Sequence, residues 1–191
     1  TKFGGVADQR SGFTTQIDGG DIDDAQWGSP TMNLTQEGVQ EFKVFRNQFD
    51  AQYGAALAAV VTVVTRSGTN DLSGTGYFFG RDDAMNARNA FQRSTPVYEQ
   101  QRTGGSLGGP IYRNRTHFFG AYEYNHVENQ KLIALPASNP FATRENGEFP
   151  AGSREHMAVA KFNHRFTDRA SAFLRYAFDD QWATRTGNPS S

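Results

Sequence analysis

The four histidines have the broadest potential chemistry in this sequence, because imidazole can act as a metal ligand or a general base. His156 and His164 are eight residues apart in a segment that alternates apolar and polar residues. In an extended strand that spacing separates them by about 26 Å, too far to share one metal ion. We interpret them, with His117 and His126, as polar positions on a β-structure. Cysteine is absent, so thiolate metal sites and disulfides are excluded.

Two further segments carry residue types that could bind a ligand. Asp21, Asp23 and Asp24 could hold calcium, but the glycine and closing glutamate of an EF-hand loop are missing, which favours a solvated turn. Gly104–Gly109 has the glycines of a phosphate-binding loop without the Lys-Ser/Thr that must follow them. Ser106 lacks the strand-to-helix turn that exposes a nucleophilic serine. No constellation supports an enzyme, and no metal or cofactor is expected.

The first seventy residues predict a small α+β unit. Phe13–Asp18 reads as a strand followed by a tight turn at Gly19-Gly20, and Val39–Phe45 reads as a second strand. Asn47–Tyr53 has the spacing of a short helical turn, which Gly54 can end. Leu57–Thr65 is nearly continuous in β-branched residues, so we expect a central strand buried on both faces.

After residue 70 the sequence changes to alternating segments of about ten residues. The second of them is rich in glycine, and Pro110 is expected to break it late. Five strands are predicted in this part of the chain: Leu72–Arg81, Arg102–Tyr112, Thr116–Val127, His156–Phe166 and Ala170–Asp180.

The predicted strands have one aromatic face and one charged face. The aromatic face is expected to meet lipid, and the charged face to point inward. The aromatic face carries Phe118, Tyr122, Tyr124, Phe162, Leu174, Tyr176 and Phe178, and the charged face carries Glu123, Lys161, Arg165 and Arg175.

The links between these strands alternate in length. Residues 82–101 and 128–155 form long links, whereas Arg113–Arg115 and Thr167–Arg169 form short ones. Antiparallel outer-membrane barrels have short periplasmic turns and long external loops in this order. A soluble antiparallel sheet with one solvated face remains the alternative, for example in an extracellular β-sandwich that serves binding or adhesion.

Composition excludes other classes. The mean hydropathy is -0.65, and no segment approaches the 18-residue apolar run of a membrane helix. The net charge of -1 provides no basic field for nucleic acid. The chain begins at Thr1 without a signal peptide and ends in loop composition, so we expect an internal fragment of a longer protein.

The segment VQEFKVFRNQFDAQYGAALAAVVTVVTRSG, residues 39–68, resembles the plug signature of TonB-dependent outer-membrane receptors. Asn47 and Gln48 depart from the Gly-Pro that is usual in that family, which places the turn there in question. The segments FTTQIDGGD, RNAF, GGSLGGPI and HFFGAYE are similar to the Oar-like subgroup. The matching positions of the signature are Glu41, Val44, Arg46, Tyr53, Gly54, Arg66 and Gly68.

This resemblance implies a division of the chain at residue 70. Residues 1–70 would be the C-terminal part of a plug domain, and residues 71–191 would be about five strands of a transmembrane barrel in the bacterial outer membrane. Such receptors bind a nutrient at the cell surface and import it with energy from the inner membrane. TonB would contact a box that is absent from this chain. The cargo would be a small molecule, an oligosaccharide or a peptide, and Arg46 would anchor the plug to a barrel carboxylate.

Overall fold

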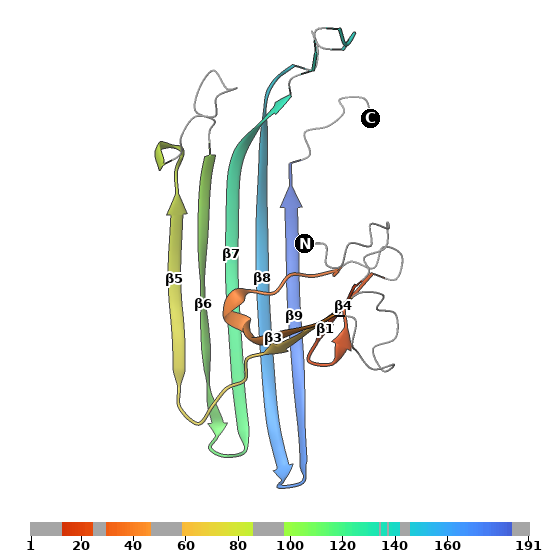
Figure 1. Ribbon diagram of the computed structural model, residues 1–191. Helices are drawn as coiled ribbons and strands as arrows, with labels where there is room; N and C mark the ends of the chain where they lie inside the picture. Colours follow the sequence, from red (N-terminus) through yellow and green to blue (C-terminus); the bar gives the residue numbers. More distant parts are fainter. Residues whose placement is uncertain are drawn as a thin grey trace. The chain divides into compact units, whose positions relative to one another are not determined.

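The computed structural model describes residues 13–24, 30–46, 59–85, 98–133, 135–136, 138–141 and 146–184. Within these residues the named strands form two sheets (Figure 1). One sheet has four strands and comes from the first 65 residues. The other has five strands that follow one another in chain order.

The four-stranded sheet has the order β2-β1-β4-β3. Its strands are β1 (Phe13–Ile17), β2 (Gly20–Asp21), β3 (Val39–Arg46) and β4 (Ala59–Thr65). β4 pairs parallel with β1 and antiparallel with β3. The β-branched residues of β4 suit an inner strand because they pack well on a pleated surface. The predicted central position of this strand is therefore confirmed.

Burial of β4 is less complete than the sequence predicts. Ala59 and Val60 are fully buried, as is Thr65, but Val61–Val64 keep part of their surface exposed. The expectation of burial on both faces therefore fails for the middle of the strand, whose side chains are half-buried.

A two-residue turn joins β1 to β2. Asp18 and Gly19 have φ angles of 47° and 84°. Positive φ at both central residues is typical of the type I′ hairpin turn, for which Asp-Gly is a preferred sequence. The turn lies one residue earlier than the Gly19-Gly20 pair that the sequence suggested. This shift gives Asp18 a fixed position at the end of the sheet.

Helix is almost absent from the described residues. The two helical pieces are 3₁₀ turns, η1 (Gln36–Gly38) and η3 (Asp83–Met85). The predicted helical turn at Asn47–Tyr53 and its end at Gly54 lie outside the described residues. The described fold is thus mainly β, and the expected α component of the first seventy residues is not part of it.

The five-stranded sheet has the order β5-β6-β7-β8-β9. Neighbouring strands run in opposite directions in Figure 1. This confirms the five predicted strands and their up-and-down succession. The strands are β5 (Ser73–Arg81), β6 (Tyr98–Tyr112), β7 (Thr116–Ile133), β8 (Gly147–Thr167) and β9 (Ala170–Ala183).

Several of these strands are longer than predicted. β7 continues to Ile133 and β8 begins at Gly147, so much of the expected link 128–155 is strand. β6 begins at Tyr98, within the expected link 82–101. The predicted ends of these strands were wrong. They were read from the alternation of apolar and polar residues, and the backbone pairing continues beyond the point where that alternation stops. β6 also passes through Pro110, which removes one donor only two residues before the strand ends.

The chain forms two compact units. The first comprises Thr1–Thr75, Gly105–Tyr122 and Met157–Asp179, and the second comprises Gly76–Gly104, Glu123–His156 and Asp180–Ser191. The predicted boundary at residue 70 stays a prediction.

A small apolar core holds the first unit together. Phe119, Ala121 and Val159 are buried against one another. Leu34, from the loop before β3, and Ala177, from β9, pack against them. These residues of β7 and β8 share the face that was predicted to point inward. The four-stranded part of the chain and the long strands therefore contact each other through that face.

Candidate functional site

The Asp18 carboxylate of the first unit is enclosed, with only 6% of its side chain exposed. The backbone amide of Thr65 donates to its Oδ1 at 2.9 Å, and the Thr65 hydroxyl donates to its Oδ2 at 2.5 Å. The Asp18 amide in turn donates to the carbonyl of Val63 at 2.8 Å. These bonds fix the carboxylate at the end of β4.

Two cations from the long strands converge on the same carboxylate. Lys161 Nζ lies 3.3 Å from Asp18 Oδ1, and Arg175 Nη1 lies 3.2 Å from Asp18 Oδ2. Lys161 is 6% exposed and also donates to the carbonyl of Thr65 at 3.1 Å. Its ammonium lies 5.0 Å from the centre of the Phe173 ring. We call Asp18, Thr65, Lys161 and Arg175 the Asp18 cluster.

The environment of Asp18 favours its charged form. Burial raises the pKa of this carboxyl, but the hydrogen bonds from Thr65 and the charge of Lys161 outweigh burial. The pKa of Asp18 is therefore lowered from its ordinary value of 3.8. The carboxylate is ionised at neutral pH, where it has two cationic partners.

Sequence reasoning did not single out Asp18. It predicted that Lys161 and Arg175 face inward, but their common partner is 143 and 157 residues away in the chain. The available signal was the Asp-Gly turn, whose positive φ angles hold the carboxylate at one place. β8 and β9 are neighbours in the sheet, so their inward side chains can meet at that place.

A second polar contact lies at the start of β3. Glu37 Oε2 accepts a hydrogen bond from the Thr75 hydroxyl at 3.0 Å and lies 3.6 Å from Arg66 Nη1. Arg66 Nε donates to the carbonyl of Val39 at 3.2 Å. Arg66, a position of the predicted plug signature, thus holds the chain between β4 and β5 against the start of β3. These groups are partly exposed, so we expect each contact to contribute little by itself.

Two glycines allow close approach in this unit. A Cβ on Gly68 would lie 2.0 Å from the carbonyl oxygen of Phe118 and 2.9 Å from that of Gly109. A Cβ on Gly38 would lie 2.6 Å from a methyl group of Val159. Gly68 is the signature glycine, and its lack of a side chain lets the segment after β4 touch the backbone of β7.

The second unit has its own buried charge. Glu123 of β7 is 1% exposed and accepts two bonds from Arg102 of β6, at 2.7 Å from Nε and 2.9 Å from Nη2. The hydroxyl of Tyr77 in β5 also donates to Glu123. A bidentate pair of this kind joins three neighbouring strands on one face of the sheet. The inward orientation predicted for Glu123 agrees with this burial.

The other signature positions are scattered. Glu41 is exposed and lies 3.2 Å from Lys43, and Val44 is 36% exposed. Arg46 is exposed at the end of β3, opposite Ala59, and no carboxylate within the described ranges is recorded as its partner. The anchoring role of Arg46 stays a prediction. Tyr53 and Gly54 lie outside the described residues.

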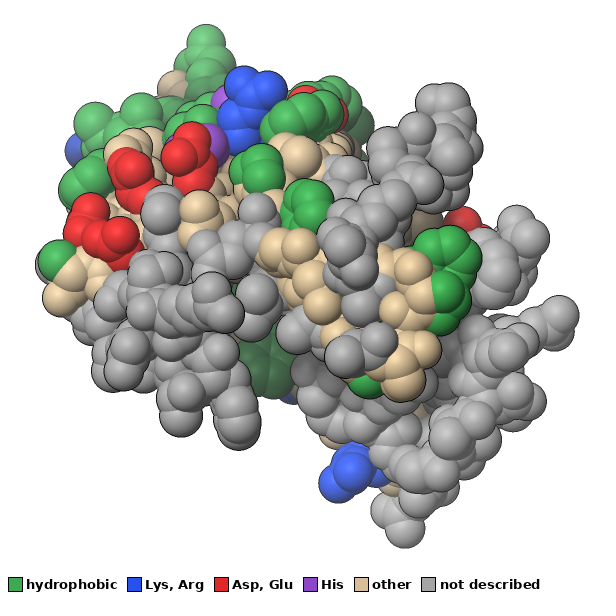
Figure 2. Space-filling view, turned by 90° about the horizontal axis from the view of Figure 1, so that it is seen from above, with side chains coloured by type: hydrophobic (Ala, Val, Ile, Leu, Met, Phe, Trp, Pro, Cys, Tyr) green, Lys and Arg blue, Asp and Glu red, His purple; other side chains and the backbone are tan. Residues whose placement is uncertain are grey.

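The aromatic face of the long strands is largely open. Leu174 is 70% exposed and Tyr176 is 65% exposed, although both are apolar or aromatic. Phe118 and Tyr124 are half-buried. Figure 2 shows many hydrophobic side chains at the surface of the described part, most of them along its upper margin. Further exposed members of this face are Tyr122, Phe162 and Phe178.

Asp21 and Asp23, which were considered as calcium ligands, accept backbone hydrogen bonds in and near the turn after β2 instead. Asp23 Oδ2 accepts from the amide of Thr15 at 2.8 Å, and Asp21 Oδ1 accepts from the amide of Asp23 at 2.9 Å. No group of three metal-ligating side chains occurs among the residues that the structure describes. In the same residues, no helix is long and apolar enough to span a bilayer.

The chain is similar to known proteins of the bacterial outer membrane. Residues 64–158 match the family model described as an outer membrane beta barrel domain. The TonB-dependent transporter Oar of Myxococcus xanthus is 24% identical over 129 residues, which cover 63% of this chain and 12% of that protein. The fold is similar to the crystal structure of the siderophore receptor PirA from Acinetobacter baumannii. That match has a TM-score of 0.66 at 16% identity and covers 93% of this chain and 25% of PirA.

The matched proteins are a transporter and a receptor. The family model covers most of the long strands, and the Oar match agrees with the resemblance seen in the sequence. Together these findings place the chain in the bacterial outer membrane and identify it as part of a TonB-dependent outer-membrane receptor.

Proposed function

We propose that this chain belongs to a transporter that binds a nutrient at the cell surface and imports it to the periplasm with energy from TonB. In this proposal residues 1–70 are the C-terminal part of the plug, and residues 71–191 begin the barrel wall. The observation that carries the proposal is the Asp18 cluster. It ties the four-stranded sheet to the inner face of β8 and β9 through ion pairs and hydrogen bonds, beside the apolar contacts of Leu34 and Gly38. Polar groups can exchange a protein partner for water when a contact breaks, so such contacts suit a plug that moves during transport.

The open aromatic face supports a lipid-facing wall. A soluble β-sandwich would cover such a face with a second sheet. Here the packing partners of the long strands, including Leu34 and Gly38, lie on the opposite face, against Val159. Charge on a lipid face would cost about 2–4 kcal/mol at the bilayer midplane. Lys161 and Arg175 are both placed on the inward face.

Cysteine labelling of two adjacent positions in β9 tests this orientation. A spin label on Tyr176→Cys in the complete transporter should be accessible to oxygen dissolved in the bilayer, because that position faces outward. A label on Ala177→Cys should be shielded from oxygen, because Ala177 packs in the core of the first unit. Equal accessibility of the two labels to oxygen would contradict the lipid-facing assignment.

Energy-dependent uptake tests the transport function. Cells that carry the complete transporter should accumulate one member of a panel of labelled ferric siderophores, oligosaccharides and peptides. Ferric siderophores come first because PirA is a siderophore receptor. A protonophore should abolish accumulation while surface binding persists, since TonB draws on the inner-membrane gradient. Uptake that continues in the presence of the protonophore would indicate a passive pore instead.

A further inference from the structure

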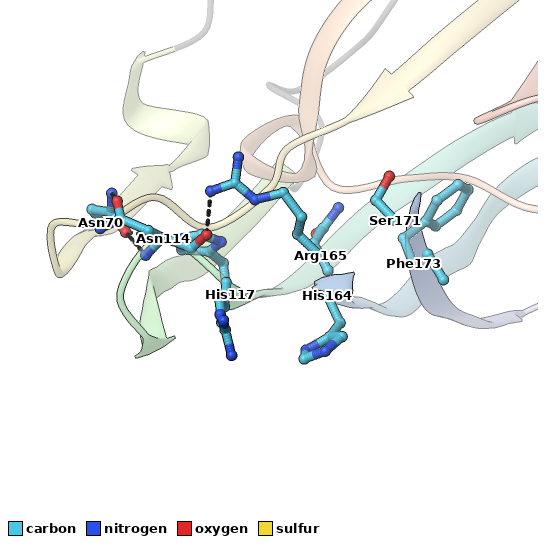
Figure 3. Close-up of a pocket in the computed structure, with 10 residues that line it drawn as sticks. Asn70, Asn114, His117, His164, Arg165, Ser171 and Phe173 are labelled. Atoms are coloured by element: carbon cyan, nitrogen blue, oxygen red, sulfur yellow. Dashed lines mark hydrogen bonds between the residues drawn. The ribbon is translucent and has the colours of Figure 1, made fainter. Parts of the chain in front are cut away.

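We propose that the first unit contains a binding site for a small oxyanion, separate from the Asp18 cluster. The site is a cavity of about 350 Å³ at the end of the sheet where the short turns lie. It is formed by the segment after β4, the turn between β6 and β7, and the facing ends of β8 and β9 (Figure 3). The volume falls in the range of small-molecule clefts.

The lining of this cavity has one sign of charge. Arg115, His117, His164 and Arg165 contribute to the lining, and among the described residues no aspartate or glutamate does so. Arginine is suited to carboxylate and phosphate because its planar guanidinium presents two parallel donors. A cavity with two guanidinium groups and no competing carboxylate in its lining is complementary to an anion.

The polar wall is held in one arrangement before any ligand arrives. Asn70 Nδ2 donates to Asn114 Oδ1 at 2.6 Å, and the backbone amide of Asn114 donates back to Asn70 Oδ1 at 2.7 Å. Asn114 adopts a φ of 63°, which asparagine tolerates better than most residues. These reciprocal bonds fix both carboxamides. Little side-chain entropy is therefore lost at this wall when a ligand binds.

The same network orients His117. Its Nε2 lies 2.9 Å from Asn70 Oδ1, which is already an acceptor for the Asn114 amide. Because a carboxamide oxygen can only accept, Nε2 carries the hydrogen in this contact. The imidazole is thus held as a donor toward Asn70, with its ring on the wall of the cavity (Figure 3).

Arg165 has donors to spare for a ligand. Its Nη2 donates to the carbonyl of Asn114, which directs the guanidinium across the cavity (Figure 3). A guanidinium has five N–H donors. Within the described ranges this is the one side-chain hydrogen bond of Arg165, and its side chain is exposed. Ser171 and Phe173 form the opposite side of the cavity.

The cavity is larger than one phosphate group, so the ligand class is a small phosphorylated or polycarboxylate solute. His117, Arg165 and Phe173 lie on the same strand face as the inward Lys161, whereas His164 and Ala172 lie on the other face. Both arginine and histidine are thus present on the inward side, which favours a solute over a lipid headgroup. The short turns lie at this end of the sheet, and the proposed function would place them in the periplasm. That part of the inference rests on the proposed function. The charge and geometry of the cavity do not depend on it.

Calorimetric titration of the purified complete transporter with pyrophosphate tests the site, with citrate as the carboxylate probe and glucose as the neutral control. We expect pyrophosphate or citrate to bind and glucose not to bind. Arg165→Gln should weaken binding about tenfold or more, because it removes a charge-assisted bidentate contact. Arg169→Gln is the matched control, since Arg169 is an exposed arginine of the adjacent turn that does not line the cavity.

The outcomes separate this site from general charge effects and from transport. Equal weakening by Arg165→Gln and Arg169→Gln would show nonspecific attraction and overturn the proposal, as would the absence of binding by the unaltered protein. Binding of anionic lipid vesicles without binding of either soluble probe would also overturn it. The titration does not involve uptake, so failure of the transport function would leave its result unchanged.

Discussion

Asp18→Asn in the complete transporter should loosen the first seventy residues while the barrel stays folded. The change leaves Lys161, which is 6% exposed, and Arg175 without their shared counter-charge. Removing one partner of a buried ion pair typically costs about 3–5 kcal/mol, because the remaining charge stays desolvated. Limited proteolysis should therefore cut residues 1–70 faster in the variant, while heat-modifiable mobility of the barrel on gels is unchanged.

Two further variants sharpen this result. Asp168→Asn makes the same chemical change at an exposed position of the turn between β8 and β9, and protease resistance should be unchanged. Arg46→Ala tests the anchor that the family resemblance implies, and it should loosen the plug if a carboxylate elsewhere in the barrel pairs with it. Wild-type protection in Asp18→Asn would show that the Asp18 cluster does not hold the plug. Wild-type protection in Arg46→Ala would reduce Arg46 to a solvated strand end.

The same cluster sets a pH dependence. The pKa of Asp18 is lower in the folded protein than its ordinary value of 3.8. The contribution of the charged carboxylate is therefore fully present above the unfolded pKa and is lost as pH falls through the folded pKa. Plug protection should be constant from neutral pH down to about pH 4 and should weaken in stronger acid. In Asp18→Asn this component of the acid dependence should disappear.

The strand faces were predictable because they depend on local alternation. The two-residue period placed Lys161 and Arg175 on one face and Tyr176 on the other, and the burial pattern agrees. The strand ends were not predictable from that signal. β7 continues through the polar residues after Val127. Backbone pairing persists there, although the side chains no longer alternate between apolar and polar.

The candidate sites depend on contacts that local sequence cannot encode. Asp18 reaches Lys161 across 143 residues, and the cavity joins Asn70 to Arg165 through Asn114. Each of these residues has an unremarkable neighbourhood in the sequence. Their proximity arises only when the sheet order brings β8 and β9 beside the end of the four-stranded sheet. Gly68 is different, because its family signature was visible in the sequence but its physical reason was not.

Gly68→Ala should displace the segment that joins the four-stranded sheet to β5. The added Cβ would lie 2.0 Å from the Phe118 oxygen and 2.8 Å from the Phe118 carbonyl carbon, and both are backbone atoms that cannot rotate away. Overpacking of this kind costs about 1–3 kcal/mol and more where the backbone must move. Amide hydrogen exchange in the complete transporter should therefore speed up for residues 66–72 and for the facing part of β7.

Gly76→Ala is the matched control for this substitution, because a Cβ at that strand position meets nothing within 4 Å. It should leave exchange unchanged or slow it, since alanine restricts the unfolded chain more than glycine does. Slower exchange in the second unit would not affect the comparison, which concerns residues 66–72. If Gly68→Ala exchanges like the unaltered protein, the segment does not lie against Phe118, and the signature glycine must serve another purpose than close approach to the wall.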